Sequence, residues 1–124
     1  MTTLSVEEQT NEIMGVQNAV RDLTGGYEIK VFRFPQGYYS SETLGLVDNL
    51  GLKTVFWTNA YADYDINNQM PVQEMLDAVL HDLHNGAIYL LHARNDTNAA
   101  ILGDFIDGAR ARGYEFGVYP LTPN

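Results

Sequence analysis

The sequence predicts a single α/β domain, residues 1–124, built on parallel strands. Helical and strand-like segments alternate along the chain, beginning with a helix. The connections between strand-like segments are long enough for parallel crossovers. Residues 87–91 form an almost unbroken apolar run, which is typical of a parallel strand buried on both faces. A chain of 124 residues holds one modest core, so we expect one domain.

The first predicted helix begins at a capping box formed by Ser5 and Glu8. Apolar residues then recur at helical spacing until Gly25-Gly26 end the helix. Residues 29–34 follow as the first predicted strand, which Pro35 ends.

The second predicted helix is capped by Ser40 or Ser41 and ends at Gly51, where a left-handed residue belongs. Residues 53–57 read as the second strand. A polar loop rich in Asn, Asp and Tyr then covers residues 58–70.

The third predicted helix has Pro71 as its first residue, a position that proline favours. The apolar run over 87–91 is the third strand. A fourth helix starts at Asp96 or Thr97, and residues 114–119 form the last predicted strand.

The composition excludes several classes of function. Seven basic and sixteen acidic side chains give a formal charge of −9, which repels a phosphate backbone, so we expect no nucleic-acid partner. The chain has no cysteine, which excludes disulfides and thiolate sites. No stretch approaches the roughly 20 apolar residues of a membrane span, and the first residues lack the pattern of a signal peptide.

Polar side chains follow three of the predicted strands. Arg33 closes the first, Asp63 lies in the loop after the second, and His92 follows the third. Sites in parallel α/β folds collect at the carboxyl ends of the strands. Because right-handed crossovers bring these ends to one face, we expect the three side chains to converge there.

Each of these residues also has a simpler interpretation. Arg33 alone is as well explained by a surface charge, and His92 by a hydrogen-bonded rim histidine. Asp63 is typical of a turn, and Trp57 of a core residue, although a tryptophan at a strand mouth also stacks on sugar rings. The joint placement at strand ends favours the functional interpretation.

Two weaker patterns remain. His81 and His84 are spaced to share one helix face and to hold a metal, but no third ligand is evident, and His84 is more simply a favourable charge near a helix C-terminus. Asn95-Asp-Thr97 matches the glycosylation sequon, which is short and common.

At the strand-end positions the sequence resembles the NodB-homology polysaccharide deacetylases, especially the type that deacetylates muramic acid before δ-lactam formation. Arg33-Phe-Pro-Gln-Gly37 is similar to the family's Arg-x-Pro-x-Gly segment. The run from Asn85 to His92 is similar to Pro-Gly-Ala-Ile-x-Leu-Leu-His, and Arg112-Gly-Tyr-Glu-Phe116 to the family's closing strand. The resemblance covers nearly the whole chain but only the C-terminal half of a distorted (β/α) barrel.

The resemblance implies a role for each matching residue. His92 matches the general acid that protonates the departing amine, and Asp63 the carboxylate that holds and tunes this histidine. Arg33 matches the arginine that tethers the family's base aspartate. The residues that match the acetyl pocket and the sugar groove are Trp57, Leu91, Pro35 and Tyr64.

The resemblance also implies what this chain lacks. The family's base and its zinc ligands come from an Asp-Asp pair and a His-x-x-x-His helix, and neither motif occurs here. We therefore expect no metal in this chain alone and no hydrolysis without a complementing N-terminal half. Part of a barrel exposes strand edges and apolar surface, so a homodimer is the alternative way to cover them.

The implied substrate is an N-acetylated cell-wall glycan, and the implied location is the cell envelope, outside the cytoplasm. Two alternatives stay open. The chain is either a non-catalytic glycan-binding or interaction protein derived from a deacetylase, or the product of a remnant reading frame that folds without a function.

Overall fold

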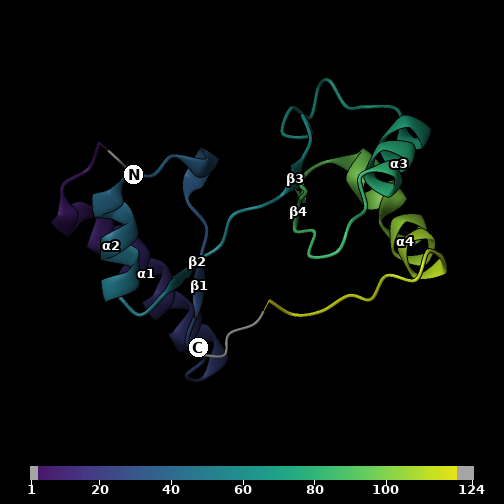
Figure 1. Cartoon of the computed structure of the whole chain (residues 1–124). Helices are drawn as coiled ribbons and strands as arrows, with labels where there is room; N and C mark the ends of the chain where they lie inside the picture. The colour runs from purple at the N-terminus through teal and green to yellow at the C-terminus, as the bar shows by residue number, and fades with distance from the viewer. Residues whose placement is uncertain (1–2, 120–124) are drawn as a thin grey trace. The chain divides into compact units, whose positions relative to one another are not determined.

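The computed structural model describes residues 3–119. The chain divides into two compact units, which are named here the N-terminal unit (residues 3–56) and the C-terminal unit (residues 57–119). Each unit contains two α-helices and one pair of short parallel strands (Figure 1). The predicted α/β class with parallel strands is confirmed. The prediction of one domain over 1–124 stays a prediction.

The N-terminal unit contains, in chain order, α1 (Val6–Thr24), β1 (Val31–Phe32), the short 3-10 helix η1 (Pro35–Gly37), α2 (Ser41–Asn49) and β2 (Lys53–Thr54). The predicted capping box is confirmed, because Ser5 accepts the Glu8 N–H. Of the two predicted caps of α2, Ser40 is the N-cap, and it accepts the Thr43 N–H. Gly25 ends α1 with φ 73°, a left-handed conformation that favours glycine.

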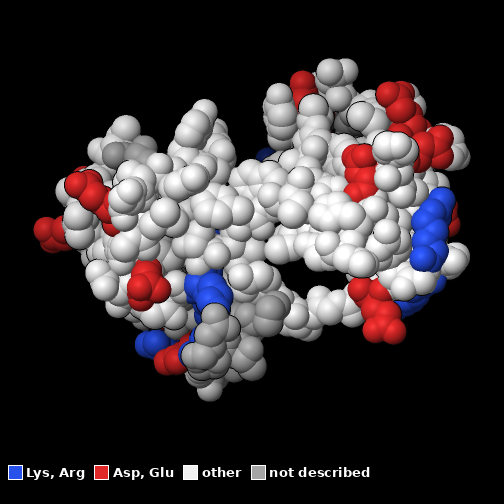
Figure 2. Space-filling view, in the orientation of Figure 1, with Lys and Arg blue, Asp and Glu red and all other residues white. Residues whose placement is uncertain are grey.

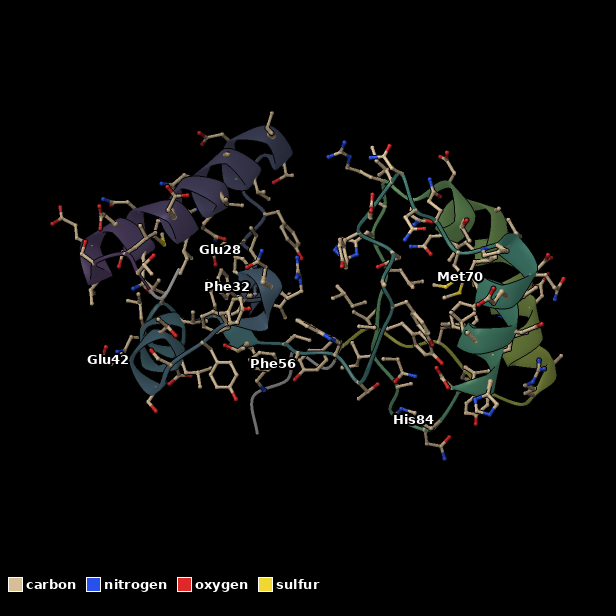
Figure 3. The ribbon with its side chains drawn as sticks, turned by 90° about the horizontal axis from the view of Figure 1, so that it is seen from above. Glu28, Phe32, Glu42, Phe56, Met70 and His84 are labelled. Carbon is tan, nitrogen blue, oxygen red and sulfur yellow. The ribbon has the colours of Figure 1, made fainter. Side chains whose placement is uncertain are left out.

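The core of the N-terminal unit lies between its helices and the β1–β2 pair. Its buried members are Ile13, Phe34, Val47 and Leu52. Phe34 is fully buried, and its ring lies 5.0 Å from that of Phe32 and 6.2 Å from that of Phe56; Phe32 and Phe56 are labelled in Figure 3. Such aromatic contacts add to the free energy gained by burial.

The C-terminal unit contains β3 (Asn59–Ala60), α3 (Val72–His81), β4 (Tyr89–Leu90) and α4 (Asp96–Ala111). The two helices pack on each other around a buried cluster of Met75, Val79, Ile101 and Phe105. Tyr89 packs against this cluster and donates its hydroxyl to the Val79 carbonyl at 2.8 Å, which ties β4 to α3. β3 and β4 run parallel, with Ala60 opposite Leu90.

Several boundaries differ from the sequence predictions. The strands form two separate pairs, each strand only two residues long, instead of longer strands in one sheet. β3 lies in the segment predicted as a loop. Pro71 was predicted as the first residue of the third helix, but α3 begins at Val72 and Pro71 is the N-cap residue before it.

The last predicted strand, residues 114–119, is wrong. These residues are described, and none of them is in a strand. Tyr114 donates its hydroxyl to the Leu83 carbonyl, and Phe116 contacts the edge of Phe105, but no described backbone segment pairs with this stretch. β-propensity alone does not make a strand when no neighbouring strand supplies the ladder of hydrogen bonds.

Acidic side chains outnumber basic ones on the face of the molecule that Figure 2 shows, in keeping with the net charge of −9. Among the residues that the structure describes, no helix is both long and apolar enough to cross a membrane.

Candidate functional site

Asp63 and His92 lie at the carboxyl ends of two paired strands. Asp63 follows β3 by three residues, and His92 follows β4 by two. Because β3 and β4 are parallel and adjacent, their ends bring the two residues together. The predicted convergence is confirmed for this pair.

The Asp63 carboxylate contacts His92 through both of its oxygens. Oδ1 lies 2.8 Å from Nδ1 of the His92 ring, and Oδ2 accepts the His92 backbone N–H at 2.7 Å. Asp63 is 6% exposed, whereas the His92 side chain is 42% exposed. A buried carboxylate thus holds a histidine whose ring reaches solvent.

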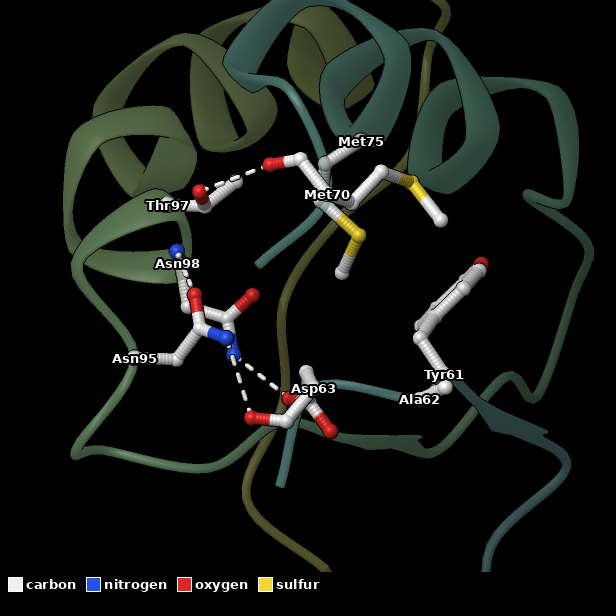
Figure 4. Close-up of a pocket in the computed structure, with 8 residues that line it drawn as sticks. All are labelled: Tyr61, Ala62, Asp63, Met70, Met75, Asn95, Thr97 and Asn98. Atoms are coloured by element: carbon white, nitrogen blue, oxygen red, sulfur yellow. Dashed lines mark hydrogen bonds between the residues drawn. The ribbon is translucent and has the colours of Figure 1, made fainter. Parts of the chain in front are cut away.

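Two asparagines at the start of α4 complete the support of Asp63. Asn98 donates its side-chain amide to Oδ2 of Asp63 and to the His92 carbonyl, the latter at 3.1 Å. Asn95 is the N-cap of α4, where its Oδ1 accepts the Asn98 N–H at 2.9 Å, and its amide donates to the Asp63 carbonyl at 2.9 Å. The network ties the loop after β3, the end of β4 and the start of α4 into one structure. Figure 4 shows the part of it that joins Asp63 to Asn95 and Asn98.

Electrostatics keep Asp63 ionised. Burial opposes ionisation, but hydrogen bonds from the His92 backbone, the His92 ring and the Asn98 amide outweigh it, so the pKa of Asp63 lies below its ordinary value. The carboxylate therefore only accepts hydrogen bonds at neutral pH.

An ionised Asp63 determines the tautomer of His92. Since Oδ1 can only accept, the ring nitrogen facing it must carry a proton, so Nδ1 is the N–H of neutral His92. Nε2 is then the nitrogen that can exchange a proton with another molecule. A positioned histidine of this kind, oriented by a carboxylate, has the geometry of a general acid or base.

Arg33 and Pro35 lie in the N-terminal unit. Arg33 follows β1 directly, and both residues line a cavity of about 280 Å³ whose walls include Ile13, Ile29 and Leu52. Both side chains are exposed. The predicted convergence of Arg33 with Asp63 and His92 stays a prediction, as do the roles of Arg33 and Pro35.

The other three residues predicted to bind substrate belong to the C-terminal unit. Tyr64 is 73% exposed beside the buried Asp63, so its ring is accessible next to the site. Leu91 packs partly buried against the core, and Trp57 is half-buried. Their roles in an acetyl pocket or a sugar groove stay predictions.

The two remaining histidines do not share a helix face as the sequence predicted. α3 ends at His81, and His84 lies beyond it. His84 approaches the Asn85 carbonyl with Nδ1 and the Asn59 Oδ1 with Nε2, at 3.0 and 3.1 Å. Nδ1 of His81 lies 3.0 Å from Oδ1 of Asp82. Both histidine rings therefore contact nearby polar groups.

The described residues do not fit a catalytic metal. Among them, no group of three or more His, Cys, Asp or Glu side chains is arranged to hold an ion. A catalytic zinc normally has three protein ligands.

Asn95 and Asn98 were not predicted as site residues. The sequence offered one signal for them, a polar Asn-Asp-Thr-Asn run between His92 and an amphipathic helix, which is typical of an N-cap. Asn95 is only 2% exposed and both ends of its amide are bonded, so it is not accessible as the glycosylation site that the sequon indicated.

Comparison with known proteins shows what the chain is similar to. A family model described as polysaccharide deacetylase matches residues 1–55. The peptidoglycan-N-acetylmuramic acid deacetylase PdaA of Bacillus subtilis (strain 168) is 35% identical over 116 residues, which are 94% of this chain and 44% of that protein. An uncharacterized 30.6 kDa protein of Geobacillus stearothermophilus is 34% identical, with the same two coverages.

A solved structure is similar to this chain as well. The structure of Bacillus subtilis PdaA, a family 4 carbohydrate esterase, matches with a TM-score of 0.87 and 36% identity over 93% of this chain and 49% of that one. The chain thus spans less than half the length of each of these relatives.

Proposed function

We infer the function from the premise that this chain is a relative of the polysaccharide deacetylases and matches the C-terminal part of these proteins. We propose that it supplies the proton-donating part of a deacetylase site that removes N-acetyl groups from amino sugars. The observation that carries the proposal is the His92 ring, which Asp63 holds at Nδ1 while the side chain stays 42% exposed.

The chemistry of amide hydrolysis explains why such a histidine is needed. An amine leaves a tetrahedral intermediate readily only after its nitrogen has been protonated. A protonated His92 ring donates this proton from Nε2, while Nδ1–H stays bonded to Asp63. The nearby carboxylate stabilises the positive charge of the ring and keeps it in one orientation.

The described residues do not supply the groups that polarise the acetyl carbonyl and activate the attacking water. Polarisation of the acetyl carbonyl and activation of water account for a large share of the barrier reduction in metal-dependent hydrolysis. In this proposal, a complementing N-terminal half supplies them, and this chain alone does not hydrolyse its substrate.

The proposed substrate is an N-acetylated cell-wall glycan, reached in the cell envelope. Relatives of this chain are named for deacetylating peptidoglycan N-acetylmuramic acid and chitooligosaccharides. Both names denote N-acetylated amino sugars, and we transfer this class, without choosing between its members.

Acetate release tests the proposal. The full chain is assayed on N-acetylated glycan oligomers alone, and again after co-expression with the segment of PdaA that precedes the matched part. We expect release only from the combination, and a decrease of about 10²–10⁴-fold with His92→Ala. Equal release with His92→Ala would show that His92 is not the acid.

A second candidate function is glycan binding without catalysis. Tyr64 favours it, because a 73% exposed aromatic ring beside a polar site is suited to stack on a pyranose face. In this case the chain binds N-acetylated oligomers, the combined proteins release no acetate, and Tyr64→Ala weakens binding.

We also propose that the chain self-associates as a homodimer when no complementing half is bound. Each strand pair has outer edges that no described strand covers. Leu23 and Val16 of α1 are 87% and 59% exposed. Open strand edges and exposed apolar side chains are the surfaces that a two-fold partner covers.

A further inference from the structure

One acceptor in the Asp63 network has no partner among the described residues. This acceptor is Oδ1 of Asn98, which is buried in a residue that is only 6% exposed. The amide nitrogen of the same side chain donates two hydrogen bonds. A buried carbonyl oxygen without a hydrogen bond destabilises a fold, and native proteins rarely leave one. Asn98 Oδ1 therefore needs a hydrogen-bond donor that residues 3–119 do not provide.

The orientation of the Asn98 amide is fixed, so rotation does not solve the problem. Nδ2 donates to the Asp63 carboxylate and to the His92 carbonyl. Exchanging the two ends of the amide would place Oδ1 against these two acceptors and lose both bonds. Oδ1 must therefore point away from them.

A small cavity lies where Oδ1 points. The space in it that the centre of a water molecule can occupy is about 10 Å³. Its walls include Asp63, Thr97, Asn98, Met70 and Met75. Figure 4 shows the Asn98 side chain directed into this space, which is named here the α4 cavity. The volume is close to the minimum that one buried water molecule requires.

We propose that one ordered water molecule occupies the α4 cavity and donates a hydrogen bond to Asn98 Oδ1. The Thr97 hydroxyl is a suited second acceptor, because it gives its own proton to the Met70 carbonyl at 2.8 Å and keeps its lone pairs. Buried waters commonly make two to four such bonds. The water completes the hydrogen bonding of the residue that joins Asp63 to His92.

The chemistry of the walls argues against an anion and against a metal cation such as Ca²⁺. An anion would meet the Asp63 carboxylate and an acceptor oxygen, both of which repel it. A metal cation such as Ca²⁺ needs six or more oxygen ligands, whereas two methionine side chains form part of these walls. Water is the donor that fits both the size and the polarity.

A high-resolution crystal structure of the full chain, crystallised without ammonium salts, tests the proposal. We expect one density peak within hydrogen-bond distance of Asn98 Oδ1. In solution, we expect cross-relaxation between water and the methyl protons of Met70 and Met75, which line the cavity, with the sign of a water that resides longer than the protein tumbles. An empty cavity without cross-relaxation would overturn the proposal.

Variants identify the group that holds the water. Asn98→Leu removes the acceptor at similar size, so we expect the density and the cross-relaxation to be lost. Asp104→Asn, on the exposed part of α4, is the matched control and should retain both. Water that persists in Asn98→Leu would show that Asn98 does not bind it. If Asn98→Leu does not fold, the measurement on the unmodified chain still decides.

Discussion

The carboxylate of Asp63 holds His92 at two points, the ring through Oδ1 and the backbone N–H through Oδ2, at 2.8 and 2.7 Å. The double contact fixes both the position and the rotation of the histidine. Asp63 in turn is held by Asn98 and, through its own carbonyl, by Asn95. The stability of the C-terminal unit and the orientation of His92 therefore depend on the same buried group.

Asp63→Asn should destabilise the C-terminal unit by about 3 kcal/mol. The amide keeps one acceptor oxygen and turns an NH₂ group toward donors, so at least one buried donor loses its bond. Urea unfolding followed by Trp57 fluorescence measures the change, because Trp57 is the single tryptophan and belongs to this unit. Asp104→Asn should stay within about 0.5 kcal/mol. An equal effect of both substitutions would contradict the role of Asp63.

The stability of the unit should fall in acid. The pKa of Asp63 is lower in the folded state, so its stabilising contribution is fully present above its unfolded pKa of about 3.9 and is lost as pH falls through the folded pKa. Urea unfolding from pH 6 to pH 3 measures this loss. Asp63→Asn should flatten the decline, leaving the part due to Asp82, whose pKa is also lowered, by its hydrogen bonds to His81 and Tyr61. An unchanged slope would contradict the assignment.

Asn95→Ala should cost about 1–2 kcal/mol, because it removes the N-cap of α4 and the bond to the Asp63 carbonyl. Asn95→Ser keeps an acceptor for the cap but loses the donor, so we expect a smaller cost. The same fluorescence assay compares them. If the two variants are equally stable, the cap does not contribute to the effect.

The isolated chain should sediment as a dimer at micromolar concentration, with twice the monomer mass of 13.9 kDa. Replacing Leu23 with Lys places a charge on the exposed apolar surface of α1 and should shift the equilibrium toward monomer if this surface is buried between copies. A monomer for the unmodified chain would refute the homodimer.

The helices and their caps were predictable because capping is local. Ser5 and Ser40 each bond to a residue three positions later, and Gly25 marks a helix end through its own backbone. The strands were less predictable, since pairing depends on neighbours far apart in sequence. Residues 114–119 have strand-like composition but no described partner, whereas Asn59–Ala60 pairs with β4 from within a polar segment.

The sequence predicted the two site residues that follow the parallel strands, Asp63 and His92. Parallel order alone brings Asp63 and His92 together. Asn98 was not predictable, because its contribution depends on the start of α4 lying against the loop after β3, a contact between residues 35 positions apart. Sequence pattern reports the chemistry of a side chain but not which buried acceptor it reaches.

Asp63 fixes the tautomer of His92 and leaves Nε2 for proton transfer. Long-range ¹H–¹⁵N correlation of the histidine side chains, at a pH where the ring is neutral, tests it most directly. We predict a proton on Nδ1 and none on Nε2, and loss of this preference in Asp63→Ala. A neutral ring with its proton on Nε2 would show that Asp63 does not fix the tautomer of His92.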